Sequence, residues 1–325
     1  MIGAIRLAQL VDARGKFLYS YDVTGRPLPG YNALRHAGSI WAMLRIGGQT
    51  VRPEARRASN WLVKRYRWNR HDGSALALVH KDQIKAGGNA LAILAHLELG
   101  TPKDMRYARG LANHLLSLQR EDGDYHHKLW TDGTIDEFRS DYYTGEVMFA
   151  LALFAARAKA PRYLASVLRA ERTLGPRSYG VAEQSHWMLY ALEATHKSLR
   201  LAPNQGVSRR DLEDHARKIV EGILDDPSYR ARNQSTPTAC RSEGLLAGWR
   251  LLGSSDEQER HTPLRDRILI EVKTNFAQQL KYQAPDGGFF TGENDFRIRI
   301  DYIQHNICSL YDFAMIQDQA IASEI

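Results

Sequence analysis

Acidic and imidazole side chains stand at the start of several short apolar stretches in this 325-residue chain. Two of these side chains are carboxylates, Glu146 and Asp301, and two are histidines, His186 and His305. Two carboxylates can act as general acid and general base when their surroundings separate their pKa values. Two imidazoles can exchange protons near pH 7. These four residues are our candidates for catalysis, and Glu243 and Asp141 are reserve carboxylates.

The apolar stretches number six, and each opens with a polar cluster. A helix that carries no charge for two turns is buried on all sides, so we expect six inner helices whose N-terminal ends surround one pocket. The clusters and stretches are Arg35-His36 before AGSIWAML, Gly87-Gly88-Asn89 before ALAILAHL, Tyr143-Thr144-Gly145-Glu146 before VMFALALF, Glu183-Gln184-Ser185-His186 before WMLYAL, Arg241-Ser242-Glu243 before GLLAGW, and Asp301-Tyr302-Ile303-Gln304-His305 before NICSLYDF. The residues that we predict to bind a ligand there are Arg35, His36, Asn89, Tyr143, Glu183, Trp187, Arg241, Glu243, Tyr302 and Gln304.

Segments of a second kind alternate with the apolar stretches. VRPEARRASNWLVKRY and RRDLEDHARKIVEGILD, for example, carry apolar residues at three- and four-residue spacing on a charged background. This pattern is typical of amphipathic helices with one buried face. Helix starts are indicated by Asn32, Thr144 and Ser208, and by Pro53 in a first turn. Strand signals are few. The chain therefore alternates between outer and inner helices six times.

The connections differ in length. Those from an inner to an outer helix are short, whereas most of those from an outer to an inner helix are long and rich in Gly, Asp and aromatics. Two long connections share a Gln-x-x-Asp-Gly-x-aromatic pattern, beginning at Gln119 and at Gln283. Long ordered loops usually carry function, so we place the pocket on their side. Six pairs close a ring, and we predict an all-α (α/α)6 barrel in which residues 1–325 form a single domain.

Composition limits the partners. The chain is 43% hydrophobic and 25% charged, as in ordinary globular proteins. Its net charge of +7 is spread over segments that mix both signs, so we expect no nucleic-acid partner. No apolar run approaches the roughly 20 residues that span a bilayer, and the first residues do not resemble a signal peptide. We therefore expect a cytoplasmic protein without a membrane partner, and the oligomeric state stays open.

Cysteine and histidine usage gives no sign of a metal. Cys240 and Cys308 are too few for a disulfide framework, and we expect them to be small buried side chains. His126 and His127 form an adjacent pair for which no third ligand has fitting spacing. The sequence therefore predicts no metal and no cofactor.

In its alternation of helices the chain resembles the six-hairpin glycosidase-like superfamily and the N-acylglucosamine 2-epimerase group that shares its toroid. The resemblance implies a carbohydrate-active enzyme with its sugar in the funnel where the inner helices begin. In glucoamylase-like members, the acid and base precede the third and sixth inner helices, where Glu146 and Asp301 lie. It thus implies a glycoside hydrolase acting on an oligo- or polysaccharide, acidic ones included. Aromatics such as Trp187 suit stacking on sugar rings.

Two alternatives remain open. The 2-epimerase group uses one histidine from each of the fourth and sixth inner helices to move a proton beside a carbonyl, and His186 and His305 occupy these places. Under this resemblance Glu183 would orient His186, and Arg35 would polarise the carbonyl. The other alternative is a toroid that binds glycans without catalysis. Lanthionine cyclases, which share the toroid, fit less well because they need a Cys-Cys-His zinc site.

Overall fold

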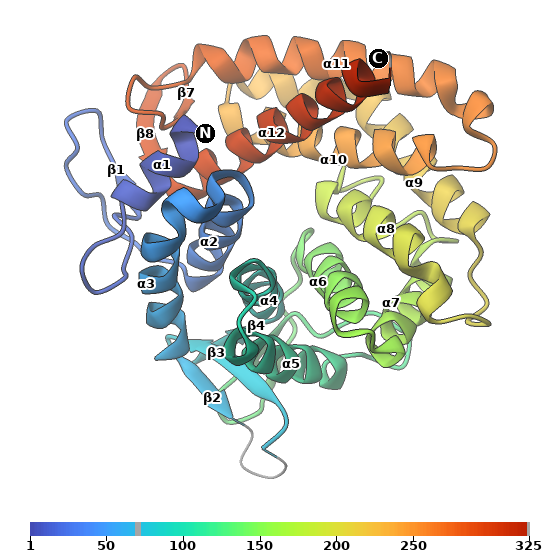
Figure 1. Cartoon of the computed structure of the whole chain (residues 1–325), viewed down its shortest axis with the longest axis horizontal. Coiled ribbons are helices and arrows are strands. Elements are labelled where there is room, and N and C mark those ends of the chain that lie inside the picture. The colour runs from blue at the N-terminus through green and yellow to red at the C-terminus, as the bar shows by residue number, and fades with distance from the viewer. Residues whose placement is uncertain (69–72, 324–325) are drawn as a thin grey trace.

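The computed structural model describes residues 1–68 and 73–323, and their twelve α-helices form two concentric rings (Figure 1). The inner ring consists of α2 (Ala33–Gly47), α4 (Ala86–Leu99), α6 (Tyr143–Ala158), α8 (His186–Ser198), α10 (Ser235–Gly253) and α12 (Ile300–Ser323). The outer ring consists of α1 (Ile2–Gln9), α3 (Arg52–Val63), α5 (Pro102–Ser117), α7 (Pro161–Leu174), α9 (Arg209–Asp225) and α11 (Gln258–Lys281).

Each inner helix packs on the next, and α12 packs on α2, which closes the ring. The predicted (α/α)6 barrel is therefore confirmed.

Burial follows the two predicted patterns. Helix α4 is buried without interruption from Ala86 to His96, as expected of a charge-free inner helix. Outer helix α9 buries only one face, through residues such as Leu212, Ala216 and Ile219 at three- and four-residue spacing. No helix in the described part of the chain is both long and apolar enough to cross a membrane.

Helix starts were predicted with one error. Asn32 caps α2 by accepting a hydrogen bond from the Leu34 amide, and Ser208 caps α9 in a reciprocal capping box. Thr144 does not precede its helix, because α6 begins one residue earlier, at Tyr143. Its hydroxyl instead donates to Asp124 in the preceding loop, at 2.8 Å.

The connections from outer to inner helices contain short antiparallel strands that the sequence did not reveal. One sheet has the order β1-β8-β7 and the other the order β2-β3-β4-β5-β6. The strands are β1 (Ser20–Tyr21), β2 (Tyr66–Trp68), β3 (Leu76–His80), β4 (Gln83–Lys85), β5 (Lys128–Trp130), β6 (Ile135–Asp136), β7 (Phe290–Gly292) and β8 (Asp295–Arg299). Both sheets lie on the side where the inner helices begin.

The repeated Gln-x-x-Asp-Gly-x-aromatic pattern forms the same turn twice. In each copy the glycine, Gly123 or Gly287, has a φ of +86°, and the aromatic side chain two residues later is fully buried. A third turn with the same backbone hydrogen bonds follows α1, with Gly15 at the glycine position and Phe17 as the aromatic residue. The turn therefore terminates three of the outer helices.

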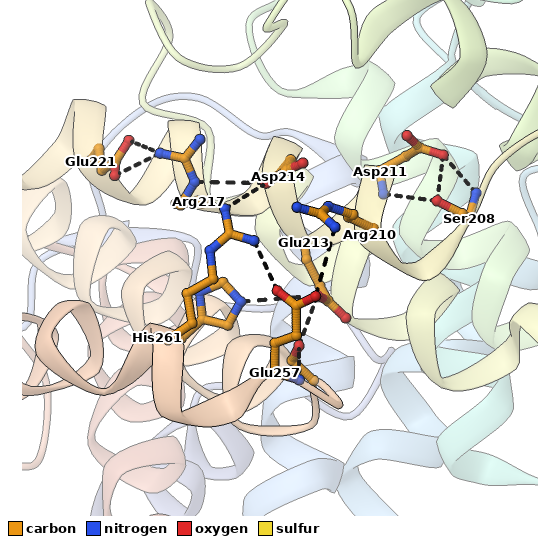
Figure 2. Close-up of polar contacts among 11 residues, drawn as sticks. Ser208, Arg210, Asp211, Glu213, Asp214, Arg217, Glu221, Glu257 and His261 are labelled. Carbon is orange, nitrogen blue, oxygen red and sulfur yellow. Dashed lines mark hydrogen bonds and ion pairs between the residues drawn. The ribbon is translucent and has the colours of Figure 1, made fainter.

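Ion pairs join neighbouring outer helices away from the inner ring. Arg210 of α9 lies 3.7 Å from Glu257, the residue before α11, and Glu213 of α9 lies 3.9 Å from the imidazole of His261 on α11, whose pKa is lowered by burial (Figure 2). The first of these pairs is largely exposed, and exposed pairs each contribute only about 0–1 kcal/mol. These contacts hold the start of α11 against α9.

Candidate active site

A cavity of about 330 Å³ lies where the inner helices begin. All six inner helices or the residues just before them contribute to its wall, as the sequence predicted for a pocket at this end of the ring. The lining residues are Asn32, Leu34, Arg35, Leu91, Ser140, Tyr142, Tyr143, Glu146, His186, Trp187, Thr236, Cys240, Arg299, Asp301, Gln304 and His305. All four candidate catalytic residues are among them.

The two histidines face each other in this wall. Their ring centroids are 5.3 Å apart and their planes nearly perpendicular, at 85°. The Trp187 ring lies 5.0 Å from that of His186 and 6.2 Å from that of His305, and the Tyr142 ring lies 5.9 Å from that of His186. The imidazoles therefore share one aromatic-walled corner of the cavity.

The surroundings of His186 and His305 favour opposite charge states. His186 is buried, and neither of its ring nitrogens has a hydrogen-bond partner among the described residues. Burial lowers the pKa of His186 well below its usual value, so the ring is neutral. Burial also opposes a charge on His305, but Cys240 and the Glu243 carboxylate beside it raise the pKa of His305 well above the usual value. One ring can accept a proton and the other can donate one.

Glu243 lies behind the histidines rather than in the cavity wall. Its Oε2 is 2.9 Å from His305 Nδ1 and 3.8 Å from His186 Nε2. Burial raises the pKa of Glu243, while the neighbouring His305 opposes that shift. We predicted that Glu243 binds a ligand and that Glu183 orients His186, but the observed geometry makes Glu243 the residue that orients a histidine, and that histidine is His305.

Glu146 lies in the first turn of α6, buried and with Oε2 unpartnered within residues 1–68 and 73–323. Burial raises its pKa to about 8, although His305 and Arg35 oppose the shift. The absence of a side chain at Gly87 makes room for it, since a Cβ there would lie 1.9 Å from Glu146 Oε2. Glu146 is therefore a protonated carboxylic acid at neutral pH.

Asp301 is in the opposite state. Burial would raise its pKa, but Arg299 and Arg35 lower it by holding the carboxylate in its charged form. Arg299 Nη2 is 2.8 Å from Asp301 Oδ2, and Arg35 Nε is 2.9 Å from the same oxygen. Arg35 also donates to the Tyr19 hydroxyl at 2.8 Å. Asp301 therefore fixes the guanidinium of Arg35 at the cavity wall.

Arg35, Tyr143, Trp187 and Gln304 line the cavity as predicted binding residues, but His36 and Asn89 do not. His36 is fully buried behind the wall, with Nδ1 2.7 Å from the Tyr31 hydroxyl and Nε2 2.9 Å from the Ala58 carbonyl. One residue turns a helix by about 100°, so Arg35 and His36 cannot face the same side. Asn89 accepts from the Leu78 amide and donates to the Lys85 carbonyl, and thus ties β3 to α4.

Three further residues that we predicted to bind a ligand also lie outside the cavity wall. Glu183 accepts a hydrogen bond from the Gly180 amide at 2.9 Å and stabilises the turn before α8. Arg241 donates to the Gln184 side chain at 2.9 Å. Tyr302 is buried, with the Arg299 guanidinium 4.3 Å above its ring. None of these three residues is among those that line the cavity.

The sequence analysis missed several lining residues, of which Cys240 is the most informative. Both cysteines are buried, as predicted, but Cys240 also borders the cavity. Its sulfur joins donor atoms of His186, Glu243 and His305, all within 4.8 Å of one another. Cys240 lies one helical turn before Glu243 on α10, a spacing that puts both on one face and was visible in the sequence.

No protein-family model matches the chain, and no curated protein matches it. Solved structures do. The structure of cellobiose 2-epimerase from Spirochaeta thermophila DSM 6192 superposes with a TM-score of 0.71 at 14% identity, over 96% of this chain and 93% of that one.

The structure of a D-mannose isomerase gives a TM-score of 0.66 at 12% identity, over 97% and 96% of the two chains. That of a GH76 α-mannanase from Bacteroides thetaiotaomicron gives 0.60 at 8% identity, over 97% and 95%. The chain has the (α/α)6 toroid fold of these enzymes.

Proposed function

We propose that this protein is a sugar epimerase or isomerase that moves a proton on a carbon beside a carbonyl. The observation that carries this proposal is the pair of imidazoles 5.3 Å apart in the cavity wall, whose surroundings lower the pKa of His186 and raise that of His305. An acid and a base positioned in this way are what such proton transfer requires.

The steps follow from the charge states. Neutral His186 removes the proton from the carbon beside the carbonyl of an open-chain sugar, and the C–H electrons move into the C–O unit as an enediolate. The guanidinium of Arg35 balances that negative charge. His305 then returns a proton. Delivery to the opposite face of the same carbon restores the carbonyl and gives the epimer, whereas delivery to the former carbonyl carbon, with the hydroxyl proton of the adjacent carbon passing to the former carbonyl oxygen, gives the isomer. His186 then releases its proton to solvent and His305 takes one up, which restores the starting charge states.

The fold supports this class of substrate without identifying the sugar. Two of the similar structures carry names of this reaction class, a cellobiose 2-epimerase and a D-mannose isomerase. Trp187 and Tyr143 present aromatic surface to the cavity, which suits the apolar face of a sugar ring. At this level the proposal agrees with the carbohydrate-active enzyme expected from the sequence.

Glycoside hydrolysis, which the sequence analysis favoured, is the second candidate. Glu146 supports it, because a buried protonated carboxylic acid in the cavity wall is the general acid that this reaction needs. We rank it second because the oxygens of Asp301, the intended base or nucleophile, are engaged by Arg299 and Arg35.

One experiment separates these functions. The protein is incubated in deuterated water with a panel of monosaccharides and oligosaccharides, and the products are analysed by NMR. We expect deuterium to appear on the carbon beside the carbonyl, together with an epimer or isomer. New reducing ends without deuterium incorporation would replace the proposal with hydrolysis. Saturable binding without either product would replace it with the glycan-binding toroid.

A further inference from the structure

Four potential metal ligands meet at the inner end of the cavity. They come from three inner helices: His186 from α8, Cys240 and Glu243 from α10, and His305 from α12. One donor atom from each lies within 4.8 Å of all the others. His186, Cys240 and Glu243 are buried, and the side chain of His305 is only 13% exposed.

The hydrogen bonds within this cluster leave several donor atoms unused. Both nitrogens of His186 and Oε1 of Glu243 are buried without a partner in the described ranges. A buried polar group in that condition costs about 1–3 kcal/mol. The proposed proton transfer needs the two imidazoles, but it assigns no role to the Cys240 sulfur or to the free oxygen of Glu243. The cluster therefore contains buried atoms that are free to bind a ligand.

The donor types and spacings fit zinc. Zn²⁺ prefers imidazole nitrogen, thiolate sulfur and carboxylate oxygen in tetrahedral sites. Its bonds of 2.0–2.3 Å place neighbouring ligands roughly 3.3–3.8 Å apart in a tetrahedron. Glu243 Oε2 is 2.9 Å from His305 Nδ1 and 3.8 Å from His186 Nε2. All four donor atoms lie within 4.8 Å of one another, so tetrahedral coordination requires the widest separation to shorten by about 1 Å.

We propose that His186, Cys240, Glu243 and His305 form a Zn²⁺ site. A bound ion would occupy the imidazole nitrogen lone pairs that the proton transfer uses. Zn²⁺ therefore acts as a reversible inhibitor that competes with the sugar for the site. The inhibitory role rests on the proposed function, whereas the binding does not.

Cobalt substitution tests the site by a readout that needs no activity. The full chain is stripped with a chelator and titrated with Co²⁺. We expect visible bands of tetrahedral cobalt and a thiolate-to-cobalt charge-transfer band, and Zn²⁺ should remove both. Cys240→Ser should abolish the charge-transfer band and weaken zinc binding by at least about 10-fold, since removing even an outer partner of a metal ligand has this effect.

Cys308→Ser is the matched control, because Cys308 is the other buried cysteine and is not part of the cluster. This variant should keep the charge-transfer band. A spectrum without that band, or one in which the band survives Cys240→Ser, would overturn the site. Glu243→Gln gives a second test, since it should weaken zinc binding while a folded circular dichroism spectrum is retained.

Activity assays then address the inhibitory role. Zinc should suppress deuterium incorporation in proportion to site occupancy, and a chelator should restore it. Full activity in the zinc-saturated protein, or activity that requires the ion, would overturn inhibition. A metal-free protein that is inactive on the whole sugar panel would contradict the proposed function and leave the spectroscopic result for the site standing.

Discussion

His186 and His305 differ in their partners, and this difference assigns their roles. His186 faces the cavity without a partner in the described structure, which suits the base of the proposed reaction, whereas His305 is held by Glu243 through Nδ1, which suits the acid. The hydrogen bond at Nδ1 fixes the ring orientation of His305, whereas His186 has no such bond within the described residues. The two residues are therefore not interchangeable.

Replacing either histidine should remove the reaction. We expect His186→Gln and His305→Gln each to lower kcat for deuterium incorporation by about 10²–10⁴-fold, the range typical of positioned proton transfer. His126→Gln is the control, because His126 lies in a loop and outside the cavity wall. Retention of the rate in both catalytic-site variants would contradict the proposed roles.

Glu146 offers a prediction in both activity and stability. Its pKa of about 8 lies above the unfolded value near 4.3, so the folded state retains a proton that the unfolded state releases between these pH values. Stability contributed by this group is therefore present below about pH 4 and is lost as the pH rises toward 8. Glu146→Gln should remove the loss, raise Tm by a few degrees at pH 8 and leave it unchanged at pH 4.

The same variant distinguishes the two candidate reactions. For proton transfer by histidines we expect Glu146→Gln to lower kcat by less than about 10-fold, since the amide keeps a neutral polar group in place. For hydrolysis the loss should be about 10²-fold or more, because the general acid is gone. Thermal denaturation monitored by circular dichroism and the NMR assay measure both effects. A fall in Tm at pH 8 would contradict the pKa argument.

At the scale of helices, glycines set the distances on which the site depends. Gly87 of α4 faces Glu146 of α6, and a Cβ at Gly244 of α10 would lie 2.9 Å from the His186 Cα of α8. The inner helices can approach closely here because these positions carry no side chain. The positions of Glu146 and His186 therefore depend on the absence of a side chain at Gly87 and Gly244.

Adjacent glycines on α4 give a matched test of this idea. A Cβ at Gly87 would lie 2.6 Å from the Tyr143 ring and closer still to Glu146, whereas a Cβ at Gly88 would meet nothing nearer than 3.7 Å. Gly88→Ala should be neutral or stabilise by up to about 1 kcal/mol, because Ala favours helix. Gly87→Ala should lower both Tm and kcat by displacing the two side chains. Equal behaviour of the variants would contradict the packing argument.

The helices could be predicted from the sequence, but the strands and part of the site could not. Inner and outer helices differ in the hydrophobicity pattern along their residues, so the sequence distinguishes the two rings. Strand β1 has only two residues and pairs with β8 near the other end of the chain, and the local sequence around β1 contains no signal for such pairing. His36 lies outside the cavity wall because α2 turns about 100° per residue, so its phase decides which side chain faces the cavity.

Across the whole molecule, polar contacts at a buried carboxylate join the outer ring to the inner ring. Asp104 of α5 is fully buried and accepts hydrogen bonds from Arg56 of α3 at 2.7 Å, while its Oδ1 is 3.0 Å from Nδ1 of His96 on α4. Thr101 caps the N-terminus of α5, the helix that carries Asp104. Burial would raise the pKa of Asp104, but these partners lower it far below the usual value. One carboxylate thus joins three helices.

This network should make stability depend on acid. A depressed pKa stabilises the folded state above the unfolded value near 3.9 and loses that contribution as the pH falls below it. Asp104→Asn should lower the free energy of unfolding by about 3 kcal/mol at pH 7, as breaking a buried pair does. The deficit should shrink at pH 2. Urea denaturation at both pH values measures it, and the exposed Asp318→Asn should show no deficit.

The ring can close only after the last inner helix, α12, has been synthesised. Arg35 leaves the ribosome more than 260 residues before its partner Asp301, and the same α12 supplies Gln304 and His305. A nascent chain that carries only the first five inner helices therefore lacks His305, the second imidazole of the cavity wall. Under the proposed function, catalytic competence comes only with the last hairpin, so unfinished or prematurely released chains should not turn over sugar.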